Sequence, residues 1–232
     1  ASTAFATRRG WSVCPGIPWS VCPGIGGQLA PESGGLVHQN LQEMHERILN
    51  GARKIFLAKG YEQASMRNIA SEINYSPGSL YFYFKDKGEI FQELHKEGFR
   101  LLLSQLKVLD KVADPFERLK AVGRIFIQFA QDNKDYYNLM FIVEEPTKSQ
   151  QSGGFQIAQE AISHLLNVVK ECQTKGRFSG MDPEYFTFMI LSTVHGICAL
   201  FYKDRTTSFI GKTNEELMEH GYECFVTLLE KS

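Results

Sequence analysis

From Leu41 onward, apolar residues recur every three or four positions along nearly the whole chain, which is the period of an amphipathic helix. The first stripe stops at Gly60, and the later stripes are separated by Pro, Gly, Asn and Asp residues. No alternating strand pattern competes with them, so the sequence predicts an all-α fold. The breaks predict helices over residues 115–131, 134–145, 155–175, 183–203 and 213–230.

Residues 65–84 predict two short helices joined by a tight turn. Ser65 and Ser76 each precede a helical pattern and are suited to accept a hydrogen bond from a backbone N–H of the first turn. Pro77 stands at the first position of the second helix, and Asn74 tolerates the left-handed backbone angles at which helices end. This arrangement is a helix-turn-helix, which places its second helix in the major groove of DNA.

The second short helix presents a polar and aromatic surface, formed by Ser79, Tyr81, Phe82 and Tyr83. Hydroxyl groups contact phosphates, and aromatic side chains can contact a thymine methyl group. The surface therefore predicts DNA contact. The alternative is a helical hairpin inside an all-helical protein, with Tyr81 and Tyr83 as half-buried core residues.

From Ile48 to Phe91 the sequence resembles the TetR-type bacterial transcriptional regulators. The resemblance is carried by Ala52, Phe56, Gly60-Tyr61, Ser65, Arg67-Asn68-Ile69-Ala70, the run Ser76 to Phe84, Lys87 and Ile90-Phe91. It implies that Ser65, Arg67, Tyr81, Phe82, Tyr83 and Lys87 face DNA. Phe82 departs from the His of many relatives, which bears on base preference, and Asn74-Tyr75 replaces the usual Gly-Val. The complete predicted DNA-binding set is Ser65, Arg67, Ser76, Gly78, Ser79, Tyr81, Phe82, Tyr83 and Lys87.

The chain is predicted to have three parts: a leader (1–37), a three-helix helix-turn-helix DNA-binding domain (38–86) and a larger helical ligand-binding and dimerisation domain (87–232). Asp86 is suited to cap a long helix that connects the two domains. The resemblance implies a homodimer through the last two long helices. Candidate interface residues are Ile190, Val194, Ile197, Cys198, Leu217, Tyr222, Phe225 and Leu229, although the same stripes would serve the core of a monomer.

The leader differs in composition from the rest of the chain. Trp11–Ile17 recurs as Trp19–Ile25, with Pro and Gly in each copy, so no helix is expected there. We interpret residues 1–37 as a disordered or artificially added leader, with a flexible arm as the alternative. Cys14 and Cys22 lack the further ligands of a zinc site, and the Arg8-Arg9 pair is not followed by the apolar region of an export signal.

The larger domain is rich in aromatic residues and predicts an apolar chamber for a small hydrophobic or aromatic effector. Tyr137, His164 or His195 would supply its polar groups. The same aromatic stripes also suit ordinary helix packing. The predicted ligand-binding residues are Phe126, Phe129, Tyr137, Met140, Phe141, His164, Phe186, Met189 and His195.

Composition is that of an ordinary globular protein, with 43% hydrophobic and 22% charged residues and a formal net charge of −1 over 232 residues. Residues 38–107 carry ten basic against eight acidic residues, whereas residues 108–232 carry thirteen against seventeen. So small an excess of basic residues favours a protein that contacts DNA at defined positions over one that binds any polyanion through charge alone. The sequence has no uninterrupted run of eighteen apolar residues, which a membrane span would need, so we expect a cytoplasmic protein. We expect it to hold no metal and no cofactor.

Together these features predict a regulator, most simply a repressor, that binds a palindromic DNA operator as a dimer and is released by its effector. The alternative is a helical small-molecule-binding protein, or an enzyme acting on a hydrophobic substrate, without DNA binding. The sequence contains no phosphate-binding Gly loop, nucleophile elbow or HExxH motif, so no catalytic residues are predicted. A redox switch through Cys172, Cys198 or Cys224 is a third hypothesis, which their apolar neighbours disfavour.

Overall fold

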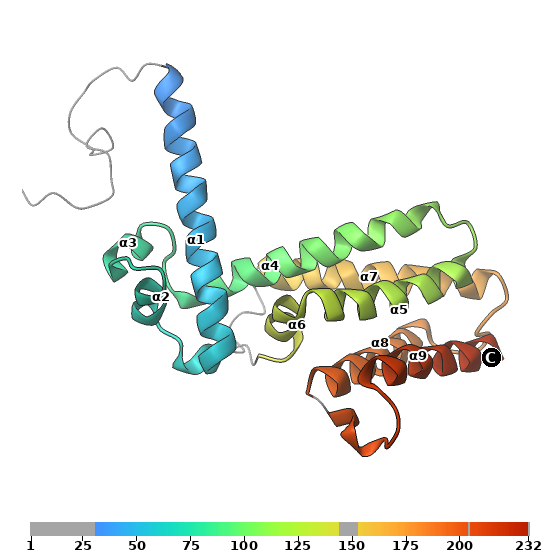
Figure 1. The fold of residues 1–232 in the computed structure, drawn as a ribbon. Coiled ribbons are helices and arrows are strands. Elements are labelled where there is room, and N and C mark those ends of the chain that lie inside the picture. The colour runs from blue at the N-terminus through green and yellow to red at the C-terminus, as the bar shows by residue number, and fades with distance from the viewer. Residues whose placement is uncertain (1–30, 144–152, 204, 232) are drawn as a thin grey trace, which may run out of the picture. The chain divides into compact units, whose positions relative to one another are not determined.

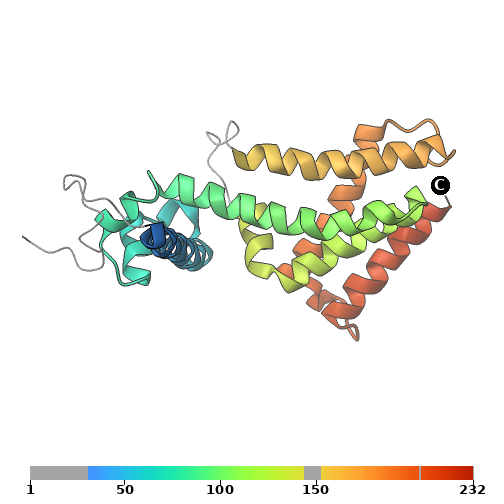
Figure 2. The same cartoon turned by 90° about the horizontal axis from the view of Figure 1, so that it is seen from above.

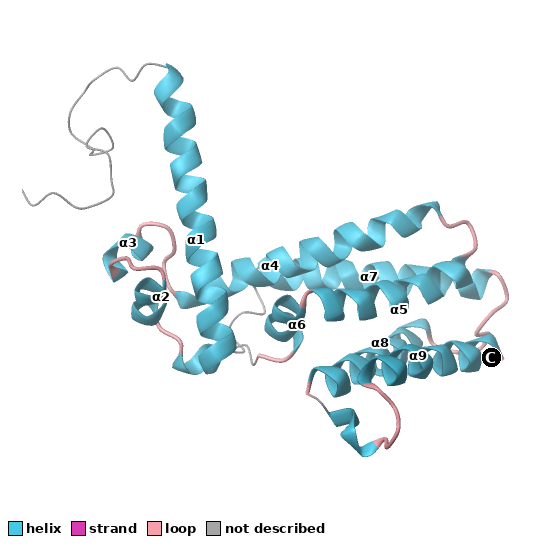
Figure 3. Cartoon of the chain, viewed as in Figure 1, coloured by secondary structure: helices cyan, strands magenta, loops and turns pink. Residues whose placement is uncertain are grey.

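The computed structural model describes residues 31–143, 153–203 and 205–231. The chain divides into two compact units, Ala1–Gln42 and Glu43–Ser232. The first unit is described only from Pro31, where a helix begins. Every regular element in the described ranges is helical, which confirms the all-α prediction (Figure 3).

The helices follow the predicted order along the chain (Figure 1). The five helices predicted after residue 114 are present as α5 to α9, although α6 ends at Phe141 and residues 144–145 of its predicted range lie outside the described residues. The elements are α1 (Pro31–Gln63), α2 (Met66–Glu72), α3 (Pro77–Tyr81), α4 (Lys87–Leu106), the 3₁₀ turn η2 (Lys107–Lys111), α5 (Pro115–Asp132), α6 (Lys134–Phe141), α7 (Gly153–Thr174), α8 (Pro183–Tyr202), the 3₁₀ turn η4 (Arg205–Ser208) and α9 (Asn214–Glu230).

Helix α1 begins earlier than the sequence predicts. We expected no helix before residue 38, but residues 31–37 are helical, so this expectation is wrong for them. The fixed φ angle of Pro31 suits the first turn of a helix, and the chain has no further proline until Pro77. The repeat with Cys14 and Cys22 lies outside the described residues. At the other end, Gly60 interrupts the helix as predicted, with φ 75° and ψ 170°.

Residues 43–94, which we call the N-terminal domain, have their own hydrophobic core. Helix α4 contributes to this core through Ile90, Phe91 and Leu94. The predicted domain boundary after Asp86 therefore falls before three residues of the N-terminal core. One further core residue, Leu139, comes from α6 and is fully buried there. The core residues carried by α1 to α3 and the following loop are Ile48, Leu49, Ala52, Phe56, Ala64, Met66, Ile69, Ala70, Ile73, Leu80 and Phe84.

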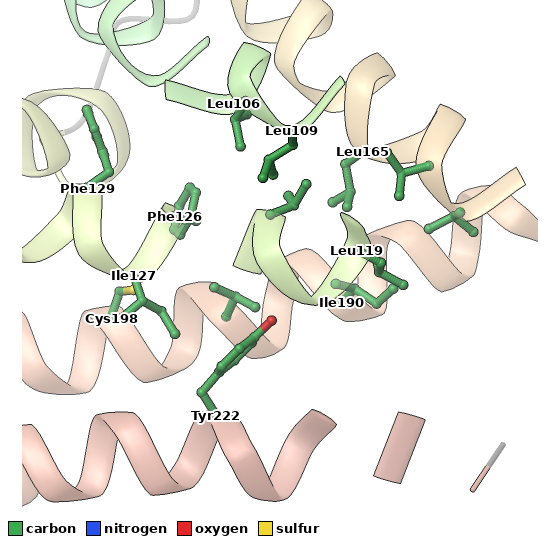
Figure 4. Close-up of a cluster of buried hydrophobic side chains, with 14 of the residues drawn as sticks. Leu106, Leu109, Leu119, Phe126, Ile127, Phe129, Leu165, Ile190, Cys198 and Tyr222 are labelled. Atoms are coloured by element: carbon green, nitrogen blue, oxygen red, sulfur yellow. The ribbon is translucent and has the colours of Figure 1, made fainter. Parts of the chain in front are cut away.

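The remainder of the chain, which we call the C-terminal domain (residues 95–231), packs α4, α5 and α7 side by side, with α8 and α9 against each other (Figures 1 and 2). The Tyr222 side chain reaches from α9 into the shared core (Figure 4). Its hydroxyl donates a hydrogen bond to the Lys120 carbonyl on α5 at 2.7 Å. A Cβ atom at Gly123 would lie 2.2 Å from this hydroxyl, so α9 can approach α5 here only because residue 123 is glycine.

Helix α8 is apolar on more than its buried side. Ile190, Val194 and Cys198 are buried within the chain, and so are Tyr222 and Leu229 of α9. These five residues therefore form core rather than a dimer interface, as the sequence alternative allowed. The exposed apolar side chains of the two helices lie elsewhere, chiefly at Tyr185 (80% exposed), Phe188 (70%), Met189, Leu200 and Leu228 (67%).

These exposed residues also explain why α8 resembles a membrane span in composition. Among the described residues it is the single helix long and apolar enough to cross a membrane, with a mean hydropathy of 1.5. A core helix of a soluble protein satisfies the same criterion, and one such helix is weak evidence. Its apolar surface is here divided between a buried stripe and an exposed one.

Candidate DNA-contacting surface and effector cavity

The predicted helix-turn-helix is present with both of its caps. The Ser65 hydroxyl accepts a hydrogen bond from the Asn68 N–H, and the Ser76 hydroxyl accepts one from the Ser79 N–H, each at 3.2 Å. Asn74 adopts φ 58°, the left-handed conformation predicted for the end of the first helix. Two short helices are thus held at a fixed turn, as a recognition helix requires.

The two sides of α3 and the residues that follow it differ sharply in exposure. Leu80 and Phe84 are buried in the N-terminal core, whereas Tyr81 is 57% and Phe82 72% exposed. Arg67 and Gly78 are also exposed. Large aromatic side chains this exposed contribute little to a core, so the structure contradicts the half-buried alternative for Tyr81. The aromatic surface is available to a partner.

Tyr83 is half-buried beside this surface. Burial, together with the neighbouring Tyr75, raises the pKa of the Tyr83 phenol above its ordinary value of 10.0. The phenol is therefore protonated at neutral pH, and its hydroxyl is able to donate a hydrogen bond to a phosphate oxygen.

Lys87 occupies a different position from the one that the resemblance implies. Its ammonium group donates hydrogen bonds to three backbone carbonyls, those of Tyr61 at 2.8 Å, Ala64 at 3.0 Å and Glu62 at 3.1 Å. It also lies 4.5 Å from the centre of the Tyr61 ring. An ammonium group has three donors, so all are used within the protein. The geometry therefore ties the start of α4 to the end of α1.

We expect Lys87→Met to lower the free energy of unfolding by about 1–3 kcal/mol, because three carbonyls lose their donor. It should leave the slope of log affinity for DNA against log salt concentration unchanged, since no phosphate contact is removed. Arg67→Met is the matched control and should reduce the slope by about one per phosphate contact. Chemical denaturation and salt titrations of DNA binding measure both effects; a reduced slope in Lys87→Met would show that this lysine contacts DNA.

The C-terminal domain contains a cavity of about 370 Å³. Its walls come from α4 to α9 and are almost entirely apolar. Four of the predicted ligand-binding residues line it: Phe126, Met140, Phe141 and His195. The volume falls within the ~300–1,000 Å³ that is usual for small-molecule sites.

The other five predicted residues do not line the cavity, because their helical faces point elsewhere. Phe129 is fully buried in the core, and Tyr137 lies behind His195. His164 faces Asp110, with 3.4 Å between Nε2 and Oδ1. Phe186 packs on Phe178, their ring centres 4.5 Å apart, and Met189 belongs to the exposed side of α8.

His195 is the most perturbed group in the cavity wall. Burial lowers the pKa of its imidazole from 6.5 to about 4, so the ring is neutral at neutral pH. Phe126 and Phe141 meet it edge to face, with ring centres 4.7 and 4.5 Å away. Its Nδ1 lies 3.5 Å from the Tyr137 hydroxyl.

Sequence reasoning missed two polar residues that line the cavity, His95 and Tyr222. His95 lies four residues after Phe91 and four before Phe99. This spacing places its side chain on the predicted buried stripe of α4. Its Nε2 lies 2.6 Å from the Leu139 carbonyl. For Tyr222 the sequence predicts a place in the dimer interface instead.

Helix α6 joins the cavity to the N-terminal domain. Met140 and Phe141 line the cavity, whereas the adjacent Leu139 is buried in the N-terminal core. Tyr136 on the same helix lies under the guanidinium of Arg53 from α1, 5.1 Å from the ring centre. The cavity wall and the core that supports α2 and α3 therefore share α6.

The described residues contain no group of three or more His, Cys, Asp or Glu side chains that could hold a metal ion. Burial raises the pKa of the Cys172 thiol to about 11 and that of Cys198 to about 12. Both thiols are protonated at neutral pH and react slowly. The geometry therefore offers little to the redox-switch hypothesis at these two positions.

Comparison with known proteins identifies both domains. Residues 48–94 match the family model of bacterial regulatory proteins of the tetR family. Residues 119–225 match the tetracyclin repressor-like C-terminal domain. The first match covers the helix-turn-helix and the start of α4, and the second runs from within α5 to within α9.

Individual relatives are similar over part of the sequence. A transcriptional regulator from Staphylococcus aureus is 32% identical over 93 residues, covering 40% of this chain and 50% of the relative. The transcriptional activator FasR from Mycolicibacterium smegmatis is 27% identical over 125 residues, covering 53% and 57%. The chain thus spans about half the length of the curated relatives it matches.

Solved structures share the fold over most of the chain. FadR from Bacillus subtilis, in complex with stearoyl-CoA, aligns with a TM-score of 0.66 at 18% identity, covering 78% of this chain and 97% of that one. The TetR family regulator PfmR from Thermus thermophilus aligns with a TM-score of 0.64 at 21% identity, with the same coverage.

The fold and the exposed recognition helix define a helix-turn-helix DNA-binding protein with a larger helical domain. The chain belongs to the TetR family of transcriptional regulators, a non-enzymatic family of DNA-binding proteins. The enzymatic alternative is therefore set aside.

Proposed function

We propose that this protein is a cytoplasmic repressor that binds a palindromic operator as a homodimer and dissociates when a small hydrophobic effector enters the cavity. The observation that carries the proposal is the double role of α6, whose adjacent residues Leu139 and Met140 belong to the N-terminal core and to the cavity wall. Through α6, a ligand in the cavity would act on the core that supports the proposed DNA-contacting surface.

The DNA-contacting surface is proposed to centre on Tyr81 and Phe82, the exposed aromatic residues at the end of α3. Phe82 has no hydrogen-bonding group, so its contact with DNA would be apolar, such as a thymine methyl group in the major groove. Phosphate contacts are assigned to the guanidinium of Arg67 and to the hydroxyls of Ser76, Ser79, Tyr81 and Tyr83. The Ser65 hydroxyl donates its proton to Asn68 Oδ1 at 2.9 Å, so Ser65 is proposed to cap α2 rather than to contact phosphate. Gly78 allows the backbone to approach the DNA closely. Lys87 is proposed to position α4 rather than to contact phosphate.

The dimer is proposed to form through the exposed apolar face of α8 and α9, which we call the dimer face: Tyr185, Phe188, Met189, Leu200 and Leu228. Large apolar side chains exposed on two neighbouring helices are what an association site requires. A two-fold dimer presents two recognition helices to two half-sites about one turn of DNA apart.

The effector is proposed to be hydrophobic because the cavity wall is apolar. The Bacillus subtilis relative was solved with stearoyl-CoA, which supports an aliphatic ligand in this fold. Release of DNA requires that the effector bind the off-DNA conformation more tightly than the DNA-bound one. Entry of a ligand against Met140 and Phe141 would displace α6, and Leu139 would carry that displacement into the N-terminal core. FasR is named an activator, so the direction of regulation is a separate measurement from DNA binding.

The proposal is tested by selecting bound sequences from a random duplex DNA pool with the purified protein. We expect a palindromic consensus for the wild type and none for a Tyr81→Ala, Phe82→Ala variant, whose exposed side chains can be removed without loss of core. A thermal unfolding transition equal to that of the wild type is the control for folding. Failure of the folded wild-type protein to enrich any sequence would refute the proposal.

A further inference from the structure

The cavity is not uniform along its length. Its end beside α6 is lined by the aromatic rings of Phe99, Phe126 and Phe141, by the imidazoles of His95 and His195, and by the Met140 thioether. These side chains contact one another, since the Phe141 ring centre lies 5.7 Å from those of Phe99 and Phe126 and 4.5 Å from that of His195. We call this the aromatic end.

The opposite end of the cavity is mostly aliphatic, with the Phe225 ring one helical turn before Leu229 on α9. It is lined by Leu106 at the end of α4, Leu119 at the start of α5, Leu165 of α7, Ile190 of α8 and Leu229 near the end of α9. Three of these side chains, those of Leu119, Leu165 and Ile190, lie on the side of the core away from Phe129 (Figure 4). We call this the aliphatic end.

The titratable side chains in the cavity wall are few, and two of them are the imidazoles of His95 and His195. No Lys, Arg, Asp or Glu lines it among the described residues, and His195 is neutral at neutral pH because burial lowers the pKa of its imidazole to about 4. Placing an unpaired charge in such surroundings is costly. A carboxylate or ammonium group enclosed here would meet no Lys, Arg, Asp or Glu side chain as a counter-ion.

Hydrogen-bonding capacity remains at the aromatic end. Nδ1 of His195 faces the Tyr137 hydroxyl, and no hydrogen bond to its Nε2 is present among the described residues. A neutral imidazole offers one N–H donor and one acceptor, so it is able to donate to or accept from an uncharged polar group. The Tyr222 hydroxyl, already donating to the Lys120 carbonyl, keeps a lone pair for a donor midway along the cavity.

We infer that the effector is an elongated, uncharged amphipathic molecule, with a neutral hydrogen-bonding group against His195 and an aliphatic chain extending toward Leu106 and Leu165. This inference rests on the proposed function, because it names the chemical class of the effector. The polar group lies beside Met140 and Phe141, so it acts on α6. A cavity of about 370 Å³ is near the small end of ligand pockets, which favours a single chain with a small head over a complete acyl-CoA.

The test compares four ten-carbon probes at pH 7.5 on the wild-type protein: decan-1-ol, decanoate, decylammonium and decane. Calorimetry or dye displacement, below the aggregation concentration of each probe, gives the affinities. We expect decan-1-ol to bind at least tenfold more tightly than either ion, and more tightly than decane. Decanoate or decylammonium binding as tightly as the alcohol would overturn the inference, and so would a lack of binding by all four probes.

Two variants test the orientation. His195→Phe keeps an aromatic ring but removes the polar group, so the preference for decan-1-ol over decane should disappear. Leu165→Phe narrows the aliphatic end, so the chain length of the best-bound alcohol should become shorter, while the preference over decane remains. An unchanged preference in folded His195→Phe would show that the polar group lies elsewhere.

DNA binding is measured in the same samples, on the duplex recovered by selection. If the protein binds this duplex but none of the probes, the inferred class of effector is wrong, whereas the proposed function as a DNA-binding regulator is retained. If decan-1-ol is bound selectively but no DNA sequence is enriched, the proposed function fails while the chemistry of the cavity is as described.

Discussion

A Phe188→Glu, Leu228→Glu variant is expected to be a folded monomer that binds the operator at least 100-fold more weakly than the wild type. Both side chains are largely exposed in the single chain, so the substitutions should cost the monomer little stability. In a dimer they place carboxylates in an apolar interface without counter-charges, which is strongly unfavourable. Operator affinity falls because each protomer then reads only one half-site.

Sedimentation velocity and DNA titration measure this result. Lys170→Glu, which changes an exposed residue on α7 away from the dimer face, is the matched control and should remain dimeric. A double variant that stays dimeric would place the interface on another surface. A monomer with unchanged operator affinity would show that dimerisation is not needed for recognition.

Adjacent residues of α6 are expected to have different effects when each is replaced by alanine. Leu139→Ala should lower the free energy of unfolding of the N-terminal domain by about 2–5 kcal/mol, because Leu139 is fully buried in that core. Operator binding by Leu139→Ala should weaken as well, because the destabilised N-terminal domain carries the DNA-contacting surface. Met140→Ala should instead enlarge the effector cavity, which Met140 lines, and change effector affinity while leaving operator affinity within about threefold of the wild type.

Hydrogen exchange resolved by residue, together with operator titration, distinguishes the two variants. Leu139→Ala should increase exchange in α2 and α3, whereas Met140→Ala should not. Equal loss of protection in both variants would mean that α6 supports the N-terminal domain as a whole and does not separate the two roles.

The helix-turn-helix was predictable from sequence because its determinants are local. Capping by Ser65 and Ser76 and the left-handed Asn74 depend on residues within one turn of each other, and the structure has all three as predicted. The helices of the C-terminal domain were predictable for the same reason. Proline and aspartate mark their starts at Asp114-Pro115 and Asp182-Pro183.

The sequence predicts that the larger domain holds an apolar cavity but not which residues line it, because the wall combines faces of six helices. Periodicity shows that α8 is apolar but not which of its two apolar stripes faces inward. The sequence therefore leaves Ile190 and Val194 as candidates for either the dimer interface or the core, and the structure buries both within the chain. His95 lies on the predicted buried stripe of α4, but periodicity does not show whether a buried side chain faces a cavity or packed core. The role of Lys87 depends on the end of α1, more than twenty residues away in sequence.

The most direct test of the account compares wild-type affinity for a duplex with two half-sites against the same duplex with one half-site scrambled. The account predicts two protomers on the intact duplex and at least 100-fold weaker binding once one half-site is scrambled. Equal affinity for the two duplexes, or one protomer on the intact site, would contradict it.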